Sequence, residues 1–322
     1  TEVGLFDLSH MGRVEVSGSG SRAWPQGLFT NDLDRIGPGR AQYTLMCRED
    51  GGIIDDLIVY QLAADRFSLV INASNSDKDL DWIRAHLVSG VELIDQTNDV
   101  SLIAFQGPKA QQLLPDVGVD LDGLFYFGLA EGSLDGVPVT IARTGYTGED
   151  GFEIFLPSDQ AARIWDRLLA TGATPCGLGA RDVLRLEAGL RLYGNDMDES
   201  IDGYAAGLGW TIRLSKGEFI GRSALVRIKA EGPSATMVGL TCADRAIPRH
   251  GCAVLVGDDF VGTVTSGTYS FWLNQAIATA SLKLSGLPLG TALDVDVRGA
   301  RVPVSVVELP FYKGSVRNAV AQ

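Results

Sequence analysis

Length, composition and charge limit what this chain can be. It has 322 residues, with 40 acidic and 27 basic side chains and a formal net charge of −13, a surface that repels phosphate backbones and argues against general nucleic-acid binding. It holds no apolar run long enough to span a bilayer and opens with no signal-peptide pattern, so we expect no membrane association.

The cysteine pattern argues against a structural metal site. There are only three histidines, and the four cysteines are scattered without a C-x-x-C pair. We therefore expect no metal and reduced thiols, as in the cytoplasm of a bacterium or the mitochondrial matrix of a eukaryote.

Strand and helix patterns alternate through the first two thirds of the chain. Period-two or apolar runs predict strands at 13–16, 42–46, 53–60, 67–72, 101–105, 137–143 and 152–155. Helical periodicity predicts helices at 77–88, 109–114, 160–170 and 179–190. From about residue 238 onward, short strands alternate with glycine-rich turns, which predicts a separate sandwich or barrel after a linker at 229–235. The pattern as a whole is typical of an α+β fold.

Two neighbouring acids interrupt the apolar strand predicted at 53–60. Alternation points Asp55 and Asp56 to opposite faces, so at least one of them faces a core or a cavity. A buried carboxylate without a partner is costly, so it needs a hydrogen-bond donor or a chemical task. For Asp55, capping of the preceding Gly-Gly turn and a functional role are equally supported. Asp56 lies deeper in the strand, which favours function.

Three further places concentrate polar groups among glycines. Tyr146 lies in a loop with three glycines, and Glu153 is a lone acid in an apolar strand, although an ordinary hairpin with an edge-strand Glu would give the same pattern. Arg181 lies in the first turn of a predicted helix, where the helix dipole disfavours a cation, so we expect a carboxylate partner or ligand rather than a plain surface position. The acidic stretch 192–199 is expected to be a solvated loop.

Long strings of the sequence resemble the T-protein family of the glycine cleavage system. They occur in the family's order along nearly the whole chain and include GLFDLSHMG (4–12), GGIIDDLIVY (51–60), TGYTGEDGFEI (144–154), GLGARDVLRLEAGLRLYGNDMDE (177–199), KGEFIGRSAL (216–225) and VGTVTSGTYS (261–270). The resemblance is interrupted at Ala205, at Met237 and at Phe271-Trp272, where the family usually has other residues.

The resemblance implies a three-domain, cloverleaf-like α+β fold around a central folate cavity. The implied domains are residues 1–14 with 97–228, residues 15–96, and an all-β barrel or sandwich at 236–322. It also implies an enzyme, an aminomethyltransferase. The aminomethyl group on the lipoyl arm of the H-protein would give its methylene to the co-substrate tetrahydrofolate, and ammonia would leave.

The resemblance also implies the roles of individual residues. Asp56 matches the catalytic acid of the family, which hydrogen-bonds the folate and helps to initiate attack by its nitrogen. Carboxylates bind N–H-rich rings through charge-assisted hydrogen bonds, which are strong. The implied folate-binding positions are Met11, Tyr43, Asp56, Ile58, Asn72, Tyr146, Glu153, Arg181 and Trp210.

Two related functions remain as alternatives at this point. Folate-dependent demethylases, such as the folate domains of dimethylglycine and sarcosine oxidases, usually have Ser-Asp in place of Asp55-Asp56. Non-catalytic folate-binding relatives carry a K-G-C-Y-x-G-Q motif, whereas this chain has Lys216-Gly217-Glu218-Phe219 without the cysteine. Both differences favour the aminomethyltransferase.

Overall fold

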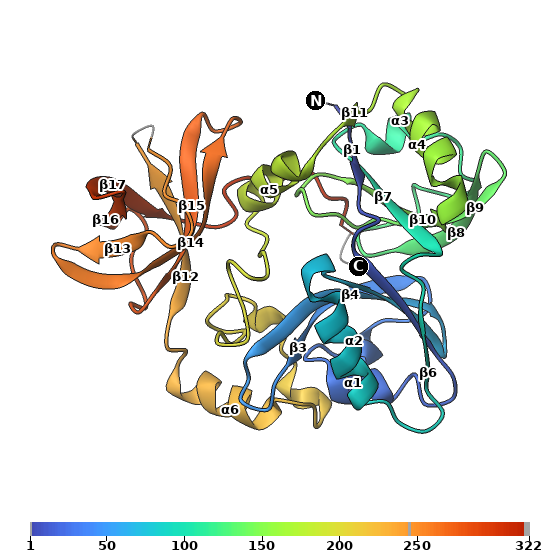
Figure 1. Cartoon of the computed structure of the whole chain (residues 1–322), viewed down its shortest axis with the longest axis horizontal. Helices are drawn as coiled ribbons and strands as arrows, with labels where there is room; N and C mark the ends of the chain where they lie inside the picture. The colour runs from blue at the N-terminus through green and yellow to red at the C-terminus, as the bar shows by residue number, and fades with distance from the viewer. Residues whose placement is uncertain (1, 244–245, 319–322) are drawn as a thin grey trace.

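The computed structural model describes residues 2–243 and 246–318. Two α+β parts and a C-terminal barrel surround a central segment of the chain (Figure 1). The predicted α+β class with an all-β C-terminal barrel is therefore confirmed. The residue limits of the three predicted domains stay a prediction. None of the described helices is long and apolar enough to cross a membrane.

The first part is a six-stranded sheet whose strands come from both ends of the N-terminal region. Its order is β11-β1-β7-β10-β9-β8, antiparallel except for the β1–β11 pair. The strands are β1 (Gly4–Asp7), β7 (Val100–Gln106), β8 (Leu129–Leu134), β9 (Val137–Ala142), β10 (Gly151–Pro157) and β11 (Thr174–Pro175). Helices α3 (Ala110–Leu113) and α4 (Ala161–Leu169) belong to this part. Ile164 and Leu168, one helical turn apart on α4, are both buried in its apolar core.

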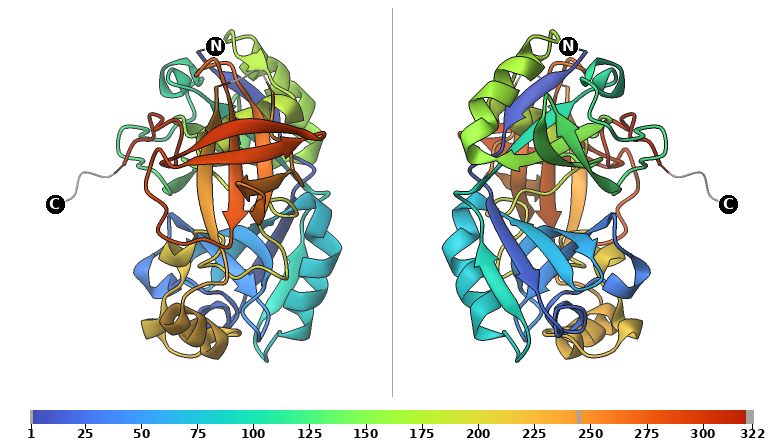
Figure 2. Two further views of the ribbon diagram at one scale, coloured as in Figure 1. Left: turned by 90° about the vertical axis from the view of Figure 1, so that its left-hand side faces the viewer. Right: turned by 90° about the vertical axis from the view of Figure 1, so that its right-hand side faces the viewer.

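The second part is a five-stranded sheet of order β3-β4-β5-β2-β6. Its strands are β2 (Gly12–Ser17), β3 (Arg40–Cys47), β4 (Ile53–Ala63), β5 (Arg66–Ile71) and β6 (Glu92–Asp95). Helices α1 (Trp24–Leu28) and α2 (Ser76–Ala85) complete it, and α2 buries Leu80 and Ile83 against the sheet. Figure 2 shows α4 and α2 on the same side of the molecule, one above the other.

The C-terminal strands close into a barrel of order β12-β15-β14-β13-β16-β17. They are β12 (Thr236–Cys242), β13 (Ala253–Val256), β14 (Asp259–Ser270), β15 (Gln275–Leu282), β16 (Ala292–Val297) and β17 (Ala300–Val307). Closure leaves no sheet edge unpaired, and the inward side chains form a core of valine, leucine and alanine.

Two further helices of ten residues each and five short 3₁₀ turns complete the described residues. The helices are α5 (Leu178–Glu187) and α6 (Arg222–Glu231), and the 3₁₀ turns are Leu33–Arg35, Ala73–Asn75, Ser158–Gln160, Gly209–Thr211 and Leu214–Lys216. In Figure 1, α5 lies between the first sheet and the barrel.

Several predicted boundaries differ from the structure. The strand predicted at 53–60 continues to Ala63, and the helix predicted at 179–190 ends at Glu187, shortly before Gly189 takes φ +67°. The helix predicted at 77–88 ends at Ala85, because His86 leaves the helical conformation and its amide donates to the Ile83 carbonyl in a tighter turn. The predicted linker at 229–235 begins inside α6, which continues to Glu231 and stops where Gly232 takes φ +90°.

The acidic stretch 192–199 is not the solvated loop that the sequence suggests. Asp196 is fully buried and forms an ion pair with Arg185 of α5, 2.6 Å between Nη1 and Oδ2. The hydroxyls of Thr265, Ser266 and Thr279 on the barrel donate to its other oxygen, at 2.5, 2.9 and 2.9 Å. Burial alone would raise the pKa of Asp196, but Arg185 and these donors hold it below its usual value. This network attaches the barrel to α5.

Apolar contacts and the C-terminal tail make the remaining connections. A buried cluster lies between the two sheets and includes Phe6, Leu8, Ala41, Tyr60, Val70, Leu102, Ala104, Leu129, Ala142 and Phe155. After the barrel the chain returns to the first part, where the Tyr312 amide donates to the Glu187 carbonyl at 2.7 Å and the Tyr126 amide to the Arg317 carbonyl at 2.8 Å.

Replacing Asp196 with Asn should lower the free energy of unfolding by about 3 kcal/mol, because Arg185 then keeps its buried charge with only the half-exposed Asp182 as counter-ion. Denaturant unfolding followed by circular dichroism measures the change. Asp258→Asn is the matched control: it breaks the Arg301–Asp258 pair on the barrel surface and should have almost no effect. Equal effects of the two substitutions would contradict the role of this network.

Candidate functional site

The two acids of β4 lie in different surroundings, as strand alternation predicts. In the β3–β4 ladder Asp55 pairs with Met46 and Asp56 with Leu45. Asp55 is completely buried, whereas Asp56 is partly exposed. The exposed acid is therefore the one that can meet a ligand, and the buried acid belongs to its support.

Hydrogen bonds from two neighbouring strands hold Asp56. The Tyr43 hydroxyl on β3 donates to Oδ2 at 2.8 Å, and Asn72 Nδ2, just after β5, donates to Oδ1 at 3.0 Å. Burial and then the charge of Asp55 raise the pKa of Asp56 to about 7, while Tyr43 and Asn72 oppose that rise. A carboxyl with a pKa near neutrality can both accept and return a proton at physiological pH.

A flat aromatic surface lies next to this acid. The rings of Tyr43 and Trp210 are stacked with centroids 5.7 Å apart and an interplanar angle of 22°. Trp210 is 56% exposed, although it is large and apolar. Burial and the adjacent Asp56 raise the pKa of Tyr43 well above its ordinary value, so its hydroxyl stays a donor. The pair offers a planar ligand both a face and a polar edge.

Tyr146 and Arg181 meet, as their shared place in the predicted site requires. The Arg181 guanidinium lies over the Tyr146 ring, 4.5 Å from its centroid, in a cation–π contact. The Tyr146 hydroxyl donates to the backbone carbonyl of Arg191. No described acid lies within ion-pair distance of Arg181, so the carboxylate partner expected from the sequence is absent from the described residues.

Glu153 is buried at the junction of the two sheets. Its Oε2 accepts hydrogen bonds from the hydroxyls of Thr144 at 2.5 Å and Tyr60 at 3.0 Å, and the side chain is only 6% exposed. Tyr60 and Thr144 carry no signal in the sequence, because a tyrosine in an apolar strand and a threonine in a turn are ordinary. Met11 and Ile58 pack against the same inter-sheet cluster as Tyr60.

The predicted site residues thus form two connected groups rather than one. Tyr43, Asp56, Asn72 and Trp210 are joined by hydrogen bonds and stacking. Tyr146 and Arg181 form the second group, and burial, with a smaller contribution from the charge of Asp56, raises the pKa of the Tyr146 hydroxyl. Glu153 makes no hydrogen bond to either group within the described residues, although its charge opposes the lowering of the Arg181 pKa by burial.

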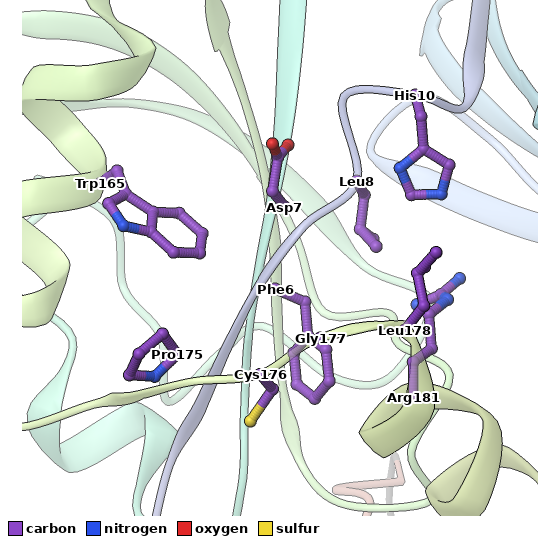
Figure 3. A pocket seen from close by; sticks show the side chains of 10 residues that line it. All are labelled: Phe6, Asp7, Leu8, His10, Trp165, Pro175, Cys176, Gly177, Leu178 and Arg181. Carbon is purple, nitrogen blue, oxygen red and sulfur yellow. The ribbon is translucent and has the colours of Figure 1, made fainter.

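A cavity of about 370 Å³ opens beside β1 and the start of α5 (Figure 3). It is lined by Phe6, Asp7, Leu8, His10, Trp165, Pro175, Cys176, Gly177, Leu178 and Arg181. Arg181 is the predicted site residue among these, and Asp56 is not one of them. This cavity therefore lies beside the site, next to Arg181, and does not surround Asp56.

Replacing Tyr43 with Phe should raise the pKa of Asp56 above its value of about 7, because the lost hydrogen bond stabilises the carboxylate form. Such a bond to a charged group contributes about 1.5–3 kcal/mol. Carboxyl ¹³C resonances, assigned by comparison with an Asp56→Asn variant, would report the change. Tyr60→Phe removes a donor to Glu153 instead and should leave that titration in place. An unchanged Asp56 titration in Tyr43→Phe would refute the assignment.

Comparison with known proteins gives one consistent result. The model of the GCVT N-terminal domain matches residues 1–216, and that of the glycine cleavage T-protein C-terminal barrel domain matches residues 236–313. The chain is 46% identical to an aminomethyltransferase of Geobacillus kaustophilus over 97% of its length and 88% of the relative, and 44% identical to one of Bacillus subtilis with the same coverage.

A solved structure agrees with these sequence relatives. The glycine cleavage system aminomethyltransferase T from Bartonella henselae superposes with a TM-score of 0.93 at 33% identity, covering 99% of this chain and 88% of that one. The chain belongs to the glycine cleavage T-protein family.

Proposed function

We propose that this chain, an aminomethyltransferase of the glycine cleavage system, transfers the methylene of H-protein-bound aminomethyl-lipoate to tetrahydrofolate with release of ammonia. The observation that carries the proposal is Asp56, a partly exposed acid with a pKa of about 7 held by Tyr43 and Asn72 next to an exposed tryptophan.

The reaction balances without an added oxidant or reductant. The methylene carbon exchanges its bonds to the amine nitrogen and to sulfur for bonds to two nitrogens of tetrahydrofolate. The two hydrogens that these nitrogens lose complete the ammonia and the thiol of the dihydrolipoyl group. Each of the two exchanges moves one proton from a folate nitrogen to a leaving group.

Asp56 is suited to move those protons. Its carboxylate would accept hydrogen from an attacking folate nitrogen, and its acid form would return hydrogen to the leaving nitrogen or sulfur. A group with a pKa near 7 does both with little cost at neutral pH. Holding the methylene carbon and the nitrogen in contact would supply much of the remaining acceleration.

The other predicted contacts would bind and orient the pterin. The stacked pair of Tyr43 and Trp210 offers a flat ring an aromatic face, and the Tyr146–Arg181 pair offers a second face and a positive charge. Asn72 would keep the Asp56 carboxylate aimed at the ring. Met11 and Ile58 would contribute apolar walls, and Glu153 would accept from the ring's N–H edge.

The compartment would be the bacterial cytoplasm or, in a eukaryote, the mitochondrial matrix.

Turnover of aminomethylated H-protein tests the proposal directly. We expect release of ammonia and formation of methylenetetrahydrofolate only when both H-protein and tetrahydrofolate are present. Sarcosine and dimethylglycine, offered as alternative donors, should give no product. Product from those small amines, or none from the H-protein, would overturn the proposal.

Replacing Asp56 with Asn should keep the fold and lower turnover by about 100-fold or more, because the amide can neither accept nor return the proton. Turnover measures the loss, and circular dichroism and thermal melting verify folding. Asp65→Asn is the matched control: this exposed acid lies in the turn at the far end of the same β4–β5 hairpin and should leave turnover unchanged. Full activity of Asp56→Asn would remove Asp56 from the mechanism.

A further inference from the structure

Behind Asp56 lies a second pair of carboxyl groups to which the proposed reaction gives no task. Asp55 of β4 and Asp79 of α2 are both completely buried. Three N–H groups donate to Asp55. Asn72 Nδ2 and Asn75 Nδ2 donate to its Oδ1 at 2.9 and 2.8 Å, and the backbone amide of Asn72 donates to its Oδ2 at 3.3 Å. Asn72 Nδ2 also donates to Asp56 Oδ1 at 3.0 Å. Asp55 and Asp56 therefore share one donor group, the side-chain amide of Asn72.

Asp79 has no such donors. Neither of its carboxyl oxygens has a hydrogen-bond partner in the described residues, and the side chain is shut off from bulk solvent. Its neighbour is the carboxyl of Asp55, which after burial contributes most to raising the pKa of Asp79. Two carboxyl groups can form a hydrogen bond only if one of them keeps its proton.

The surroundings of Asp79 favour its protonated form. Burial, followed by the hydrogen bond and the charge of Asp55, raises the pKa of Asp79 to about 10. Asp55 already accepts three N–H donors, which is the environment of a carboxylate. The nearby cation Lys78 is engaged elsewhere: it donates to the Ile54 carbonyl at 2.7 Å and the Tyr193 hydroxyl at 2.9 Å.

The described residues offer no cluster of metal ligands that could join the two acids. Within residues 2–243 and 246–318, no three His, Cys, Asp or Glu side chains are arranged to hold a metal. The other charged or titratable groups that interact with these acids are Tyr43, Lys78, Tyr146 and Tyr193; Arg191 acts on Tyr43, and Asp198 and Glu199 act on Tyr193. None of them donates a hydrogen bond to Asp79.

We propose that Asp79 is a positioning residue for aminomethyl transfer: as a neutral carboxylic acid it donates to Asp55, which fixes the Asn72 amide and thereby aims the Asp56 carboxylate at the substrate. The inference rests on the proposed function for its catalytic consequence. Its structural half, the protonated acid at position 79, stands apart from that function and has its own test.

Infrared spectroscopy of the whole chain tests the structural half. At about pH 8.5, between the pKa of Asp56 (about 7) and that of Asp79 (about 10), wild-type protein should show the carbonyl band of one buried protonated carboxyl group. Asp79→Asn should lose that band, and Asp81→Asn, an exposed position on the same helix, should keep it. Absence of the band from wild type, or its persistence in Asp79→Asn, would overturn the proposal whether or not the protein turns over H-protein.

Turnover of aminomethylated H-protein by two variants tests the catalytic half. Asp79→Asn keeps a neutral donor to Asp55, so kcat should stay within about threefold of wild type and its pH profile should not move. Asp79→Leu keeps the size but loses the donor, so kcat should fall by about 10- to 100-fold, with little change in KM for tetrahydrofolate.

The pH profile separates positioning from mere stability. Without the Asp79 donor, no hydrogen bond from position 79 offsets the negative charge of Asp55 next to Asp56, so the Asp56 pKa rises and the acidic limb of the Asp79→Leu profile moves to higher pH. Asp81→Leu should change neither kcat nor the limb. Equal losses in Asp79→Asn and Asp79→Leu, or an Asp79→Leu profile that is merely lower without moving, would refute the positioning role. Inactivity of wild type in this assay would instead count against the proposed function.

Discussion

The shared hydrogen bond of Asn72 is the interaction on which the site depends. Two adjacent carboxyls on one strand repel each other, and each loses hydration when the sheet packs. Asn72 Nδ2 reaches both Asp55 and Asp56, because the β4–β5 register places residue 72 directly beside residue 56. One neutral amide thus holds the buried acid and the reactive acid in a fixed relation without cancelling the charge of either.

Helix α5 connects this arrangement to the barrel. Arg181 in its first turn lies over Tyr146, and Arg185 one turn later binds the buried Asp196, which also accepts hydroxyl donors from the barrel. A rigid helix therefore carries a ligand-facing residue and a barrel-facing residue on neighbouring turns. The C-terminal strands contribute none of the predicted ligand contacts. Their position still matters for the site, because a displacement of the barrel would move Arg181.

Much of the fold could be predicted from the sequence, because strand alternation and helix periodicity are local signals. Asp56 could be identified for the same reason, as an acid inside an apolar strand. Asp79 and Asp196 could not. Asp79 lies on an amphipathic helix where an acid usually faces solvent, and Asp196 lies in a run that reads as a polar loop. Their burial depends on partners at least 11 positions away in the chain, Asp55 and Arg185 among them, and no local pattern encodes that distance.

The choice of a proton in place of a cation behind Asp55 has a consequence for the reactive acid. A lysine at position 79 would also satisfy Asp55, but it would cancel the charge that, after burial, raises the pKa of Asp56. Asp56 would then stay ionised through the neutral range and would return a proton poorly to a leaving group. A carboxylic acid orients Asp55 and leaves its negative charge in place. Burial and the retained charge of Asp55 thus keep the pKa of Asp56 near the pH at which it can both take and give a proton.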